Sequence, residues 1–194
     1  MRLLLGPVVA SVLAVLATPA VAVPSYAETF RGGDPARDVQ RLTRSGDGDD
    51  YTAAPTRANP DVLAATVRHT KRRVVIDVRF DDIFVPPGRT GVFAVFGDLR
   101  SDTSGASWDM WATQERRQGR VTIFRRGKRC LGSSRVDYAR DTARVVLPRR
   151  CLGDPRWVRV SITAWSQDKV FVWEDRAFTA GFMRDHYTPR LSAG

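Results

Sequence analysis

The residues that could carry out a reaction show none of the common catalytic arrangements. The chain has only two histidines, His69 and His186. His69 lies between Arg68 and Lys71, and neighbouring positive charges make a poor setting for a general base. The motifs of nucleophile elbows, zinc proteases, dithiol redox sites and phosphate-binding loops are absent. We therefore predict a protein that is not an enzyme.

Carboxylates leave one catalytic alternative open. A hydrolase that works with two carboxylates needs both of them to face one cleft. The chain supplies the residue type, but no spacing selects a pair among the candidates Asp77, Asp81, Asp82, Asp109, Glu174 and Asp175. The alternative to a binding protein is therefore a secreted hydrolase whose carboxylates converge only in the fold.

The two cysteines, Cys130 and Cys151, are the only ones in the chain. An even cysteine count in an exported chain indicates a disulfide, and a zinc site would need more Cys or His than this chain offers. The residues between them predict a β-hairpin with arms at 136–138 and 143–147 and a turn at 140–142. Pairing of the arms would bring the cysteines into disulfide range and close a loop that stabilises the fold by about 3 kcal/mol.

Tryptophans are the second chemical feature of the chain, which has five of them. Trp157 and Trp165 fall on the polar side of a strand whose other side carries Val158 and Val160. Exposed aromatic rings on a sandwich face can stack on sugars, so we predict a ligand-binding face formed by Trp157, Arg159 and Trp165. The alternative is that the rings cover a sheet edge or pack under loops against arginine side chains.

The charge balance is strongly basic, with 31 basic and 21 acidic residues and a formal net charge of +10. Acidic residues are interleaved with the arginines along the chain, which favours a solvated, soluble surface over a polyanion-binding stripe. An exported chain with interspersed acids also argues against specific nucleic-acid binding. The expected partners are a glycan or an anionic polymer of the cell envelope, bound by a monomer.

The N-terminus has the layout of a secretory signal peptide, residues 1–27. Arg2 precedes an apolar run, and small residues give two cleavage positions, after Ala22 or after Ala27. The apolar run is shorter than the roughly 20 residues that a membrane-spanning helix needs. We therefore expect a secreted protein with no transmembrane span.

Alternation of apolar and polar residues predicts the strands. The clearest case is Val74–Phe80, where apolar residues recur at every second position. Further strands are expected at 38–42, 63–68, 92–96, 107–113, 121–124, 157–165, 170–173 and 177–179, with a turn at 174–176. Since no segment shows a helical period, we predict an all-β fold, an antiparallel β-sandwich of jelly-roll type.

The expected domain organisation has four parts. After the signal peptide, a polar segment at 28–59 joins the sandwich, and the β-sandwich domain itself covers 60–180. Residues 181–194 are polar and are expected to form a loosely ordered tail.

Two segments near the N-terminus carry a resemblance, Asp34-Pro35-Ala36-Arg37-Asp38-Val39 and Asn59-Pro60-Asp61-Val62. Their order resembles the opening of DOMON-like and family 9 carbohydrate-binding sandwiches. The segments Val67–Val75 and Pro148–Val160 resemble a group of uncharacterised secreted proteins of high-GC Gram-positive bacteria. The first resemblance implies a carbohydrate-binding sandwich, and the second implies export without pointing to an activity.

The carbohydrate-binding resemblance also implies a structural calcium site. Acidic residues near this opening can hold calcium in such sandwiches, which here selects Asp34, Asp38, Asp49 and Asp61. Calcium takes six to eight oxygen ligands, and clustered carboxylates on a Gly-rich loop would supply several. The alternative is a solvated acidic loop without a metal, and no other cofactor is expected.

These observations together predict a secreted, non-enzymatic binding or interaction module for a glycan or a cell-envelope polymer. Besides the hydrolase, a purely structural envelope protein is the remaining alternative.

Overall fold

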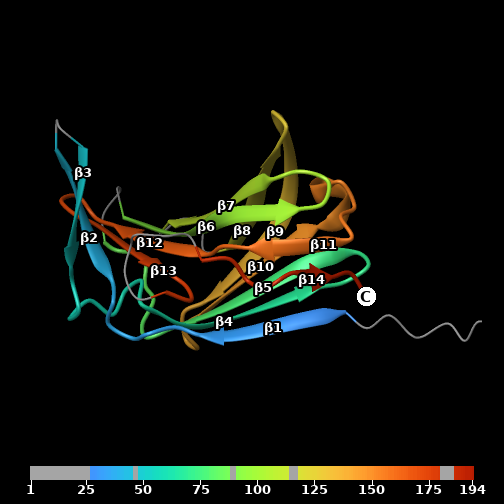
Figure 1. Ribbon diagram of the computed structural model, residues 1–194. Coiled ribbons are helices and arrows are strands. Elements are labelled where there is room, and N and C mark those ends of the chain that lie inside the picture. Colours follow the sequence, from blue (N-terminus) through green and yellow to red (C-terminus); the bar gives the residue numbers. More distant parts are fainter. Residues whose placement is uncertain (1–26, 46–47, 88–90, 114–117, 180–185) are drawn as a thin grey trace, which may run out of the picture.

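The computed structural model describes residues 27–45, 48–87, 91–113, 118–179 and 186–194 (Figure 1). The side chains at 44, 45, 48, 49 and 118 are not among those described. Residues 1–26, which hold almost all of the expected signal peptide, lie outside these ranges, so export stays a prediction.

Antiparallel strands account for nearly all of the regular structure, and no α-helix forms within the described ranges. The elements are β1 (Glu28–Gly33), β2 (Gln40–Ser45), β3 (Gly48–Ala53), β4 (Val62–His69), β5 (Arg73–Phe80), β6 (Val92–Ser101), β7 (Ala106–Thr113), β8 (Gln118–Arg125), β9 (Lys128–Asp137), β10 (Thr142–Pro148), the 3-10 helix η1 (Arg149–Leu152), β11 (Trp157–Val160), β12 (Thr163–Gln167), β13 (Val172–Arg176) and β14 (Leu191–Ser192). The predicted all-β, antiparallel fold is confirmed. Among the described residues, no helix combines the length and the apolar content needed to cross a bilayer.

The strands form one open sheet that folds over on itself. Its order is β1-β4-β5-β10-β9-β8-β7-β6-β12-β13-β2-β3, with β11 and β14 attached beside β6. Figure 1 shows β1, β4 and β5 in a layer beneath β6, β7 and β12. The inward faces of both layers meet in one core, where Ile76 and Val145 from the lower part pack with Phe93 and Trp108 from the upper part. Period-2 alternation places these residues on one side of each strand.

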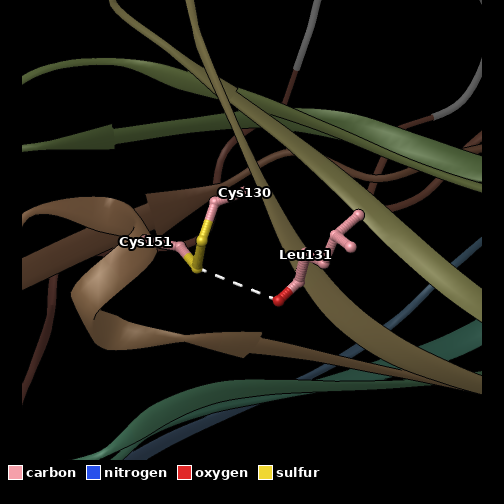
Figure 2. The surroundings of a disulfide bond; sticks show 3 residues. All are labelled: Cys130, Leu131 and Cys151. Atoms are coloured by element: carbon pink, nitrogen blue, oxygen red, sulfur yellow. Dashed lines mark hydrogen bonds between the residues drawn. A yellow bond between two sulfur atoms is a disulfide. The ribbon is translucent and has the colours of Figure 1, made fainter.

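The cysteine hairpin has the predicted form. β9 and β10 pair antiparallel around a turn, and Cys130 and Cys151 form a disulfide with a Cα–Cα distance of 5.6 Å. Cys130 lies within β9, opposite Ile123 of β8, while Cys151 lies in η1 just after β10. Figure 2 shows the Sγ atom of Cys151 beside the carbonyl oxygen of Leu131, at 3.9 Å. The disulfide therefore joins the β9 arm of the hairpin to η1, the helical turn that follows β10.

The ends of the described chain are more ordered than their composition suggests. β1 pairs with β4, and β2 and β3 form the opposite edge of the sheet, so the segment 28–59 is part of the sandwich. The expectation of a loose tail is wrong for the described residues 186–194. There β14 pairs with β11, Leu191 is buried, and Nδ1 of His69 donates to the Leu191 carbonyl over 2.9 Å. These short strands show no clear alternation of apolar and polar residues, and hydrogen bonding to neighbouring strands keeps them ordered.

Two other local expectations also need correction. The predicted turn at 174–176 lies in β13, while 177–179 forms a turn where a strand was expected. His69 was expected in a basic turn, but it is the fully buried last residue of β4. Burial lowers the pKa of His69, so the imidazole is neutral in the core.

Candidate functional site

One face of the upper layer carries unusual side chains for a surface. In β7, Trp108, Met110 and Ala112 point into the core, so Asp109 and Trp111 point outward. The strand pairing puts Trp111 beside Ala94 of β6, Ala94 beside Trp165 of β12, and Trp165 beside Glu174 of β13. A row of residues from four strands therefore runs across the outer face of the sheet.

The outer face is hollowed into a trough. Its volume is about 600 Å³, and its lining includes Tyr51, Phe96, Asp109, Trp111, Trp165 and Glu174. Figure 1 shows β2 and β3 standing steeply at one end of the flatter strands β6, β7 and β12. We call this hollow the aromatic trough.

The two tryptophans of the aromatic trough contact each other edge to face. The ring centroids of Trp111 and Trp165 are 5.2 Å apart and the ring planes are 88° to each other. Trp111 is 47% exposed, and Trp165 is half-buried. Both rings flank the small side chain of Ala94 in the same cross-strand row, which leaves space between the strands for them to meet. The pair presents apolar ring surface to solvent at the centre of the sheet.

Charged and polar groups surround this ring pair. Glu174 is buried to 7% exposure and accepts from Nε of Arg176 at 3.1 Å, while Asp98 and Asp109 add carboxylates on β6 and β7. The backbone amide of Asp98 donates to Oγ of Ser161 at 2.9 Å. Apolar rings beside hydrogen-bonding groups suit a ligand that has both apolar faces and hydroxyl groups.

The three residues that were predicted to bind a ligand lie on the same face of the sheet, but they do not form one site. Trp165 lies in the aromatic trough. Trp157 and Arg159 lie toward the opposite end of β6, where Arg190 covers the Trp157 ring at 4.5 Å and Nε of Arg159 donates to the Thr188 carbonyl. Trp157 and Trp165 are eight residues apart along the strand direction, which is roughly 26 Å.

Sequence reasoning missed Trp111 as a site residue. The signal was present, because Trp111 is a large apolar side chain on the otherwise polar side of β7. Glu174 was missed as a trough residue because 174–176 was expected to be a turn. Trp108 and Trp173 are buried, so these two tryptophans belong to the interior.

A second group of interest is a set of partly or fully buried acids. One carboxylate oxygen from each of Asp34, Asp38 and Asp175 lies within 4.8 Å of the others. Asp61 interacts electrostatically with Asp34 and with Asp175. We call these four residues the acidic cluster. The fold thus brings Asp34 and Asp38, two of the four residues selected for calcium, together with Asp175. Asp61 does not belong to this group of close oxygens, and the side chain of Asp49 lies outside the described residues.

Backbone amides hold the carboxylates of the acidic cluster in place. Asp61 accepts from the Arg37 amide with both oxygens, at 3.1 and 2.9 Å, and Asp175 accepts from the Val62 amide at 2.6 Å. Asp34 accepts from the Thr179 amide at 3.1 Å. The other carboxylate oxygen of Asp34 is buried and accepts no hydrogen bond from the described part of the chain.

Burial and mutual repulsion raise the pKa values of Asp34, Asp61 and Asp175 in the acidic cluster. Desolvation is the largest cause for Asp34, whose pKa rises to about 7, and for Asp175, whose pKa rises to about 8. Repulsion from Asp38 adds to both shifts, and the amide hydrogen bonds oppose them. Carboxylate oxygens from three residues that lie within 4.8 Å of one another match the ligand preference of calcium. Calcium binding by this cluster stays a prediction.

No family model, curated protein or solved structure matches the chain. The resemblance to carbohydrate-binding sandwiches and to secreted proteins of high-GC Gram-positive bacteria therefore stays a prediction.

Proposed function

We propose that this protein is a secreted, non-enzymatic binding module and that the aromatic trough binds a saccharide chain. The observation that carries the proposal is the edge-to-face pair of the exposed Trp111 and the half-buried Trp165 in a hollowed sheet face. A pyranose ring has apolar C–H faces and a rim of hydroxyl groups. The tryptophan rings suit the faces, and the carboxylates of Asp109 and Glu174 suit the hydroxyl groups as acceptors.

Intrinsic tryptophan fluorescence with a panel of cell-wall glycans tests the proposal. Binding in the aromatic trough should quench or shift the emission, because Trp111 and Trp165 lose contact with water. The change should disappear in Trp111→Ala and persist in Phe171→Ala. Phe171 is a matched control, since it is an exposed aromatic residue outside the trough lining. A panel in which no glycan changes the emission would contradict saccharide binding and favour the purely structural alternative.

One observation favours the hydrolase alternative. Asp109 pairs with Phe96, and Asp98 is two residues further along the same outer face of β6. Such diagonal neighbours are about 7–8 Å apart at the backbone, which allows their side chains to reach the separations found between glycosidase carboxylates, roughly 5–9.5 Å. Prolonged incubation with each glycan that binds, followed by analysis of reducing ends, separates the two functions. If new reducing ends form with the wild-type protein but not with Asp109→Asn, the protein is a hydrolase and not only a binding module.

The predicted signal peptide, residues 1–27, supports an extracellular role for this binding. Mass spectrometry of the protein from culture medium should show a new N-terminus after Ala22 or after Ala27. Recovery of the full-length chain only from the cytoplasm would contradict the secreted location.

A further inference from the structure

The aromatic trough continues into a second hollow along β6. This hollow has a volume of about 350 Å³ and is lined by Arg100, Phe124 and Tyr187, among others. Both hollows share the lining residues Asp98 and Ser107. A ligand longer than one sugar that lies in the trough can therefore extend past Asp98 toward Tyr187.

Two arginines meet on the ring of Tyr187. The guanidinium carbon of Arg100 is 4.1 Å from the ring centroid, and that of Arg159 is 5.7 Å from it. Arg100 and Arg159 are also direct cross-strand partners on β6 and β11, so their side chains share one face of the sheet. Like charges directly opposite each other destabilise a sheet.

The structure offers these arginines little compensation from acidic groups. Within the described part of the chain, neither Arg100 nor Arg159 forms an ion pair. Asp98 is the acidic residue that lines the second hollow, and it lies on the trough side of Arg100. Asp102, near the other end of β6, is already paired with Arg156 at 3.0 Å. A bound anion would relieve the repulsion between the two guanidinium groups.

We propose that Arg100 and Arg159, supported by Tyr187, form a subsite for an anionic group on the same saccharide chain whose neutral rings lie in the aromatic trough. The inference rests on the proposed function and specifies its ligand class, an acidic polysaccharide. Guanidinium groups bind carboxylates and phosphates through paired N–H donors, so the anion is a uronate carboxylate or a phosphate ester. Arg100 is six residues beyond Ala94 along β6, about 20 Å, so the ligand is an oligomer.

Three hexasaccharides with a common backbone test the subsite. The probes are a neutral β-1,4-glucan hexamer, its form carboxylated at C6 and its form phosphorylated at C6, measured by titration calorimetry at low salt. The wild-type protein should bind at least one charged form about tenfold more tightly than the neutral form, the effect expected of one charge-assisted contact. The preferred charged form identifies the source of the anion, and added salt should reduce the preference.

Substitutions separate the subsite from the trough. Arg100→Gln combined with Arg159→Gln should abolish the preference for charged forms, so that the affinity for the charged hexamers falls about tenfold further than the affinity for the neutral hexamer. Arg190→Gln is the matched control, since the Arg190 guanidinium also covers an aromatic ring, but that ring is Trp157 and not the Tyr187 ring of the subsite. It should keep the preference.

The outcomes distinguish the two proposals. Equal affinity of the wild-type protein for neutral and charged hexamers would overturn the anion subsite and leave the trough intact. A charge preference that survives the double substitution would also overturn the subsite. Binding of the charged forms that depends on the arginines, with no binding of the neutral form and no effect of Trp165→Ala, would uphold the subsite and overturn the trough. No binding of any hexamer would contradict both.

Discussion

At the scale of single residues, two adjacent acidic residues of β13 lie on opposite faces of the sheet and belong to different sites. Glu174 points into the aromatic trough, while Asp175 points inward to the acidic cluster. The raised pKa of Asp175 follows from this burial. A single residue of shift in the register of β13 would exchange the two environments, which is why side-chain alternation matters for both sites.

The acidic cluster gives a prediction for metal-free protein. The pKa values of Asp34 and Asp175 are raised from 3.8 to about 7 and about 8, so the folded state holds these protons more tightly than the unfolded state. Their contribution to stability is therefore full below pH 3.8 and is lost as the pH rises to about 8. With a chelator present, we expect the melting temperature to fall by about 5 °C or more between pH 5 and pH 8. Asp175→Asn should flatten this pH dependence. An equal fall of the melting temperature in the wild-type protein and in the variant would show that the pH dependence does not come from the acidic cluster.

Calcium should reverse the loss of stability at high pH. At pH 8 the carboxylates of the acidic cluster can ionise and bind the cation, so calcium should raise the melting temperature of the wild-type protein. At pH 5 the effect should be smaller, because protons compete for the same oxygens. Asp77→Asn is a suitable control, because Asp77 is an acid outside the cluster. No calcium response at pH 8, or one that persists in Asp175→Asn, would exclude calcium binding by the acidic cluster.

At the scale of elements, the disulfide fixes the β9–β10 hairpin against η1. Replacing both Cys130 and Cys151 by Ala removes a cross-link across a sequence separation of 21 residues. The free energy of unfolding should fall by about 3 kcal/mol, as the unfolded chain regains entropy. Denaturant titration measures the change, and binding of glycans should be unaffected because neither cysteine lines the trough. A change below about 1 kcal/mol would mean that the hairpin is held mainly by its packing.

The strand β14 makes a second prediction at this scale. Leu191 is buried in the core and its carbonyl accepts from His69, so Leu191→Ala should lower the free energy of unfolding by about 2 kcal/mol or more. Ser192→Ala is the control, because the Ser192 side chain is exposed. Equal stability of the two variants would restore the expectation of a loosely ordered tail.

At the scale of the whole molecule, alternation was enough to predict the class of the fold and most of its strands. The strongly alternating Val74–Phe80 and the cysteine hairpin are present as predicted. β1 and β14 were missed, because they are ordered by partners distant in sequence rather than by their own pattern. The acidic cluster could be predicted in part, because the resemblance to carbohydrate-binding sandwiches selected Asp34, Asp38 and Asp61, whereas Asp175 reaches them only through the pairing of the sheet.

The aromatic trough depends even more on long-range pairing. Trp111 and Trp165 are separated by more than fifty residues, and only the pairing of β7, β6 and β12 makes them neighbours. The alternation in each strand shows which face a tryptophan occupies, but it does not show which strands are adjacent. The face of the sheet that Trp165 occupies could therefore be predicted, but not that Trp111 lies beside it.

The most direct test of saccharide binding is the affinity of tryptophan variants for a neutral hexasaccharide bound by the wild-type protein. Trp111→Ala and Trp165→Ala should each weaken binding about thirtyfold, because truncating a central interface tryptophan costs about 2 kcal/mol. Phe171→Ala should bind like the wild type, and melting curves should show that all three variants are folded. Folded tryptophan variants that keep the wild-type affinity would contradict saccharide binding in the aromatic trough.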